Sequence, residues 1–199
     1  MDLQQMILDR MSYSRYGAFC IRDFLDLASY VAIRKALDRL ENDGRIRRII
    51  RGIYDKPRYS KKFNMFEAPN IENVAKSLAR NYNWTICPSG NLSLNLLGLS
   101  TQIPARYIYI STGPYAEYEI DGTSLEFRHT NNMMFTDFSF ITLLLIQAMK
   151  AIGRGNILYE DIEHLRAYLT NKEKRDLLKD ASKTVYWIRD IIMDICEEK

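Results

Sequence analysis

Hydrophobic residues recur at helical spacing between residues 29 and 42. Ile33, Ala36, Leu37 and Leu40 would share one face of a helix. Ser29 is a suitable N-cap, and Asn42-Asp43-Gly44 supplies a stop. The opposite face is polar, so the pattern predicts an amphipathic helix with one side free for solvent or a ligand.

The pattern changes from helical to strand-like after Gly44. Isoleucines are interspersed with arginines as far as Tyr54, and Arg51-Gly52 marks a bend, so we predict a short basic hairpin. Upstream we predict a helix, a strand and a short second helix, over Leu3–Met11, Ala18–Ile21 and Arg22–Leu27. This order of elements is typical of a winged helix-turn-helix, which places a helix and a wing on DNA.

The remainder of the chain predicts a different kind of domain. Periodicity is lost between Pro57 and Pro69, which we interpret as a linker. Beyond it we predict helices over 71–81, 88–97, 137–152, 158–169, 171–181 and 185–197, and strands over 84–87, 106–111, 115–120 and 123–129. The predicted fold class is α+β, with a winged helix-turn-helix over residues 1–62. A mixed interaction domain with a small antiparallel sheet and a helical C-terminus follows over 63–199.

The charge of the chain is unevenly distributed. Residues 1–62 carry 14 Lys and Arg against 8 Asp and Glu, whereas residues 63–199 carry 14 against 17. Eight basic residues and one acid, Asp55, lie within Arg45–Lys62. A basic end favours a polyanionic partner, and the acidic remainder argues against uniform coating of nucleic acid.

The cysteines and the apolar segments indicate the compartment in which the protein is expected. The three cysteines are far apart and form no zinc-ligand spacing, which indicates a reducing compartment. The N-terminus lacks a secretory signal, and the most apolar run, Phe138–Met149, is too short to span a bilayer. We therefore expect a cytoplasmic protein, and no cofactor is predicted.

Two stretches resemble one known family. The first runs from Ser29 to Pro57 and includes Ala36-Leu37, Arg39-Leu40, Gly44, Ile46-Arg47-Arg48 and Arg51-Gly52-Ile53-Tyr54-Asp55. The second comprises Pro88-Ser-Gly90, Leu96-Leu97-Gly98-Leu99-Ser100-Thr101-Gln102, Pro104, Tyr109 and Gly113-Pro114. Both resemble AbiEi-like antitoxins, transcriptional regulators of type IV toxin–antitoxin (abortive phage infection) systems. The resemblance implies a repressor of its own operon, with a second domain that counters a nucleotidyltransferase-like toxin.

The expected partner is therefore double-stranded DNA, in particular the chain's own promoter or operator. Arginine and lysine can read guanine edges in the major groove, and wing arginines can hold phosphates or enter the minor groove. The predicted DNA-binding residues are Ser29, Tyr30, Arg34, Lys35, Arg39, Arg45, Arg47, Arg48 and Arg51. Because strand neighbours point to opposite faces, Arg47 and Arg48 cannot both face the DNA.

Two alternatives come from other classes. The N-terminal domain could be a protein-interaction module that binds no DNA. Less favoured is a nucleic-acid-processing enzyme, built on Pro88–Thr101 or on the carboxylates Asp121 and Glu126 beside Arg128. No Asp-x-Asp or phosphate-loop motif supports an enzyme, so we predict that the protein is not one.

Overall fold

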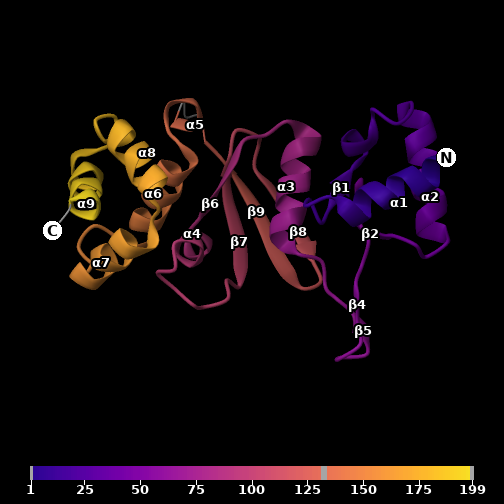
Figure 1. Ribbon diagram of the computed structural model, residues 1–199, viewed down its shortest axis with the longest axis horizontal. Helices are drawn as coiled ribbons and strands as arrows, with labels where there is room; N and C mark the ends of the chain where they lie inside the picture. Colours follow the sequence, from indigo (N-terminus) through magenta and orange to yellow (C-terminus); the bar gives the residue numbers. More distant parts are fainter. Residues whose placement is uncertain (1, 131–133, 198–199) are drawn as a thin grey trace. The chain divides into compact units, whose positions relative to one another are not determined.

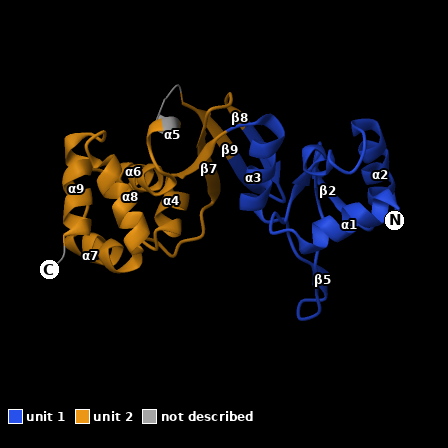
Figure 2. Ribbon diagram, turned by 45° about the horizontal axis from the view of Figure 1, so that its top comes forward, with its two compact units in different colours: residues 1–84, 117–125 blue, residues 85–116, 126–199 orange. Residues whose placement is uncertain are grey.

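The computed structural model describes residues 2–130 and 134–197 of an α+β protein (Figure 1). The chain forms two compact units: unit 1 comprises residues 1–84 and 117–125, and unit 2 comprises residues 85–116 and 126–199 (Figure 2). Unit 1 continues beyond residue 62, where we expect a domain boundary. The division into domains 1–62 and 63–199 stays a prediction.

Unit 1 begins with three helical segments and a three-stranded sheet. The elements are α1 (Leu3–Tyr13), β1 (Phe19–Cys20), the 3₁₀ helix η1 (Ile21–Phe24), α2 (Tyr30–Asn42), β2 (Arg47–Ile50) and β3 (Ile53–Asp55). The strand order is β1-β3-β2, and both pairs are antiparallel. The predicted elements of this region are therefore present. Their observed ends differ from the predicted ends by at most two residues, except in η1, which is shorter than predicted.

The core of this region is built from the predicted hydrophobic stripe of α2. Ile33, Leu37 and Leu40 are fully buried and pack with apolar side chains of α1, β1 and η1. The Ser29 hydroxyl caps α2 by accepting from the Ala32 N–H at 3.4 Å. Gly44, at φ 66°, then turns the chain toward the sheet. Burial of one stripe leaves the opposite face of α2 exposed.

Helix α3 (Ile71–Tyr82) also belongs to unit 1 and packs on β1, β3 and η1. Asn70 caps it through its side chain, as the sequence predicts. Arg80 donates to both carboxylate oxygens of Asp23 at 2.9 Å and to the Ala18 carbonyl at 2.8 Å. These bonds join α3 to the loop before β1 and to η1, so the basic N-terminal region has structural support beyond residue 62.

The predicted linker over 57–69 is wrong in part. Strands β4 (Tyr59–Ser60) and β5 (Met65–Phe66) pair in this segment as an antiparallel hairpin that projects from the rest of unit 1 (Figures 1 and 2). Asn64, at φ 53°, makes the turn. Because each strand has two residues and no face is buried, the hairpin leaves no periodicity in the sequence.

The chain after α3 forms a four-stranded sheet and a helical core. Its elements are β6 (Ile86–Ser89), α4 (Asn91–Leu96), β7 (Arg106–Ser111), β8 (Ala116–Ile120), β9 (Thr123–His129), α5 (Met134–Asp137), α6 (Phe140–Ile152), α7 (Tyr159–Tyr168), α8 (Asn171–Ala181) and α9 (Tyr186–Cys196). The strand order is β6-β7-β9-β8, with β6 and β7 antiparallel. Asp121-Gly122 makes the predicted hairpin turn, with both residues at positive φ.

Helix α6 is the centre of unit 2. It is buried continuously from Ile141 to Met149 and packs against α4, α8 and β6. The sequence predicts a helix over 137–152, and α6 begins three residues later because Ser139 caps it and accepts from the Thr142 N–H. Asp137 is instead the last residue of the separate helix α5. In the described ranges, no helix has the length and apolar character needed to cross a membrane.

Candidate nucleic-acid interface

The exposed face of α2 carries most of the predicted base-reading residues. Arg34, Lys35 and Arg39 are all exposed. Arg34 lies 3.9 Å from Asp38, a surface pair one helical turn away that holds the guanidinium only weakly. Lys35 and Arg39 have no ion-pair partner among the described residues. These cations are available to a ligand.

The hairpin β2–β3 and the turn before it add a second set of exposed cations. Arg45, Arg48 and Arg51 are exposed, and none forms an ion pair in the part of the chain that the structure describes. Ile50 pairs with Ile53 across the turn, where Gly52 adopts φ 81°. The turn therefore presents Arg51 at the end of the hairpin, with Arg48 on the strand leading to it.

Arg47 is placed differently from the other predicted contacts. It lies directly opposite Asp55 in the sheet, and its guanidinium donates to both carboxylate oxygens at 3.0 and 2.6 Å. A third bond, 3.1 Å long, runs to the Glu67 carbonyl. The hydrogen bonds that Arg47 donates to the Asp55 carboxylate hold the pKa of Arg47 above its usual value, and Asp55 is 7% exposed. This bidentate pair gives Arg47 a role in joining β2, β3 and β5.

The first turn of α2 presents both a predicted residue and one that the sequence analysis missed. Tyr30 is 55% exposed, as is suitable for a contact, whereas the Ser29 hydroxyl is used as the helix cap. Val31 is 61% exposed on the face opposite the buried stripe. At about 100° per residue, Val31 lies on the same side of the helix as Lys35. Its position outside the buried stripe therefore allows its exposure to be predicted from the sequence. An exposed apolar side chain there can contact a thymine methyl.

The residues of the enzyme alternative are placed in structural roles. The Ser89 hydroxyl donates to Gln147 at 2.9 Å, and that of Ser93 donates to the Gly90 carbonyl at 2.6 Å. Glu126 is paired with Arg128 at 2.8 Å, and Asp121 makes a turn. Across the described residues, no three His, Cys, Asp or Glu side chains gather as a metal site would require.

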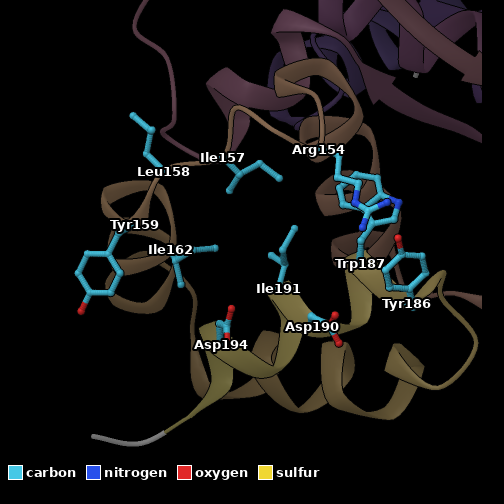
Figure 3. Close-up of a pocket in the computed structure, with 10 residues that line it drawn as sticks. All are labelled: Arg154, Ile157, Leu158, Tyr159, Ile162, Tyr186, Trp187, Asp190, Ile191 and Asp194. Atoms are coloured by element: carbon cyan, nitrogen blue, oxygen red, sulfur yellow. The ribbon is translucent and has the colours of Figure 1, made fainter.

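Unit 2 contains a groove of about 360 Å³ between α7 and α9 (Figure 3). Ile157, Ile162 and Ile191 line its floor, and Asp190 and Asp194 follow one edge along α9. At the other end Arg154 lies over the Tyr186 ring, with 4.6 Å between the guanidinium carbon and the ring centroid. The groove has an apolar floor, an acidic edge and a basic end, which suits a protein segment better than a small anion.

Most of the chain matches a described protein family. Residues 6–177 match the model of a family described as a family of unknown function (DUF6088). No curated protein matches the chain. The match spans α1 to α8 and so includes the exposed cations of α2 and of the β2–β3 hairpin together with most of the second sheet and its helices.

Proposed function

The chain belongs to the DUF6088 family, and we propose that it is a DNA-binding transcriptional regulator. The observation that carries this proposal is a set of exposed cations without an ion-pair partner among the described residues, on two consecutive elements and the turn between them. Lys35 and Arg39 lie on α2, Arg45 lies in the turn that follows it, and Arg48 and Arg51 lie on the β2–β3 hairpin. Within residues 45–62 the cations are not interleaved with exposed acids, because Asp55, the one acid of that segment, is buried and bound by Arg47. Such a surface suits phosphates.

The proposed N-terminal fold is a winged helix-turn-helix. Helix α2 follows η1 and packs on it and on α1, and the hairpin β2–β3 comes directly after α2. Strand β1 completes the sheet by pairing with β3. In such a fold the exposed face of α2 enters the major groove, and the β2–β3 hairpin is the wing that contacts the adjacent backbone or minor groove.

The roles of the residues differ within this proposal. Val31 and Lys35, in line on the exposed face, are proposed to contact base edges, with Arg34 and Arg39 on either side. Tyr30, Arg45 in the turn after α2, and the wing residues Arg48 and Arg51 are proposed to hold the backbone. Arg47 is left out of the contacts, because a guanidinium held by Asp55 and Glu67 is not free for phosphate.

The test is a selection of full-length protein against a library of randomised duplex DNA. A shared motif among the bound duplexes is expected, with tightened selection raising its frequency. Lys35→Ala should relax the preference at one position of that motif. If no motif is enriched and no duplex is bound at about 0.1 M salt, the DNA-binding proposal is wrong. The N-terminal region would then be better explained as a protein-interaction module.

A second role, neutralisation of a toxin, is proposed for unit 2. The resemblance to AbiEi-like antitoxins suggests the partner, a nucleotidyltransferase-like toxin, and the α7–α9 groove offers a surface for it. Tyr186, 60% exposed beside the groove, is a suitable anchor for a protein partner. On this proposal the protein is an autoregulating antitoxin.

Growth with the toxin induced from a separate promoter tests this role. Tyr186→Ser should abolish rescue, while Met193→Ser, an exposed change on α9 outside the groove, should leave it intact. Replacement of Arg48 and Arg51 should abolish repression and preserve rescue. Equal loss of rescue in the Tyr186 and Met193 variants would contradict a specific role for the groove.

A further inference from the structure

The hairpin β4–β5 has an unusual surface for a part of a protein that no other layer covers. Tyr59, Phe63, Met65 and Phe66 are 50 to 67% exposed, and all four lie within residues 59–66. Tyr59 and Phe66 are directly opposite in the two strands, and their rings meet edge to face at 5.3 Å. A two-stranded hairpin by itself buries little apolar surface. An exposed group of large apolar side chains indicates a binding surface.

Cations surround the same apolar side chains. Arg58, Lys61 and Lys62 are exposed, and none forms an ion pair within residues 2–130 and 134–197. The Lys62 ammonium lies over the Phe63 ring, 5.2 Å from its centroid. Residues 56–67 contain four basic side chains and one acid, Glu67. The cations favour a polyanionic partner, and the exposed aromatic rings favour a partner with flat apolar surfaces. A nucleic acid has both properties.

The base of this hairpin is continuous with the proposed wing. The guanidinium of Arg47, on β2, donates to the Glu67 carbonyl directly after β5. A polar cleft of about 350 Å³ opens beside this bond, and Arg15, Lys56 and Arg58 contribute cations to its lining. Lys56 is oriented there by a 2.8 Å bond to the Ser12 hydroxyl. Three further cations therefore line the cleft between the base of the β2–β3 hairpin and the base of the projecting hairpin within unit 1.

We propose that the β4–β5 hairpin is a second DNA-contacting element, which binds duplex DNA flanking the site read by α2 and the wing. Lys61 and Lys62 hold phosphates, and Phe63 enters the groove and perturbs base stacking, as apolar side chains of minor-groove binders do. This inference rests on the proposed DNA-binding function. Lys61, Lys62 and Phe63 lie together in the turn between β4 and β5, so the end of the projecting hairpin presents two cations beside an aromatic ring.

The experiment uses the full chain and two duplexes carrying the selected motif. One duplex ends at the motif, and the other extends it by roughly ten base pairs on each side, about one helical turn. Wild-type protein should bind the longer duplex at least tenfold more tightly at about 0.1 M salt. In the longer duplex, 2-aminopurine at one flanking position should brighten on binding, because unstacking relieves its quenching.

Two variants divide the proposed roles. Lys61→Ser with Lys62→Ser should lower the slope of log affinity against log salt by about 1.8 on the longer duplex, since each lost phosphate contact contributes about 0.9. Lys172→Ser with Lys179→Ser removes the same charge from exposed positions of unit 2 and should leave the slope unchanged. Phe63→Ser should keep the slope and abolish the 2-aminopurine signal.

The outcomes separate this inference from the function on which it rests. If wild-type protein binds neither duplex, the DNA-binding function fails. If it binds both duplexes equally and the hairpin variants match wild type, the function stands and the inference is overturned. The inference is equally overturned if the hairpin variants lose self-association or binding to anionic phosphatidylserine vesicles while their DNA affinity is unchanged.

Discussion

Arg47 and Arg48 are neighbours in the chain but have opposite surroundings. Arg47 faces Asp55 across the sheet in a bidentate ion pair, whereas Arg48 is exposed on the other face of the strand. Strand alternation requires this division. A count of basic residues treats the two alike, although one supports the fold and the other is free for a ligand.

Arg47→Ala should therefore destabilise unit 1. The change leaves the Asp55 carboxylate buried without its partner, which should cost about 2–4 kcal/mol of the free energy of unfolding. Arg48→Ala should change that free energy by less than about 0.5 kcal/mol, as is usual for an exposed position. Denaturant unfolding measures both, and equal stability of the two variants would refute the structural role of Arg47.

Asp180 makes a pH-dependent contribution to unit 2. Burial by itself raises the pKa of this carboxyl, but hydrogen bonds from the Ser139 N–H and the Thr142 hydroxyl, each 2.8 Å long, outweigh burial and lower the pKa. A lowered pKa in the folded state means that the stabilisation is present above the pKa of an unfolded aspartate, about 3.9, and is lost as the pH falls.

Asp180→Asn tests this contribution. The variant should melt at a lower temperature than wild type at pH 7, and the difference should shrink as the pH falls below about 4. Asp176→Asn, on the same helix, bears no such hydrogen bonds among the described residues and is the matched control. A melting difference between Asp180→Asn and wild type that stays constant from pH 7 to pH 3 would contradict the assignment.

At the scale of elements, the geometry of the wing depends on one glycine. Gly52 adopts φ 81°, and a Cβ there would meet no atom within 4 Å, so substitution strains the backbone alone. Gly52→Ala should cost about 1–2 kcal/mol and displace Arg51, which weakens DNA binding. Gly155→Ala has equal space without a positive φ and should be neutral. Unfolding and DNA affinity measured together test this, and a Gly52 variant as stable as the Gly155 variant would contradict it.

Elements with a strong local signal could be predicted from the sequence. Helix α8 has its predicted bounds, because the Thr170–Glu173 capping box fixes its start. The β8–β9 turn is also as predicted, since Asp121-Gly122 favours positive φ at both positions. The hairpin β4–β5 could not be found, because strands of two residues with no buried face carry no period.

Whether each candidate side chain is free to contact a ligand was harder to predict than the element on which it lies. The exposure of α2's polar face follows from its buried stripe, and Val31 could have been found by the same reasoning. The pairing of Arg47 with Asp55 depends on the cross-strand register, which the turn at Arg51-Gly52 sets. The attachment of α3 through Arg80 and Asp23 joins residues 57 apart, which no local pattern encodes.

For the whole molecule, the charge asymmetry is more local than the sequence halves suggest. Unit 1 carries 16 Lys and Arg against 13 Asp and Glu, because Glu117, Glu119 and Asp121 belong to it, and unit 2 carries 12 against 12. The excess of positive charge is therefore concentrated in the segment 45–62, which holds the wing and the first half of the β4–β5 hairpin. Binding driven by such a segment is steeply salt-dependent.

The salt dependence of binding to the selected duplex tests the central claim, that the wing cations contact DNA. Arg48→Ala with Arg51→Ala should lower the slope of log affinity against log salt by about 1.8, two phosphate contacts at about 0.9 each. Arg175→Ala with Arg189→Ala, which removes two exposed arginines of unit 2, should leave the slope at its wild-type value. Equal slopes for wild type and the wing variant, with both proteins folded, would contradict the account.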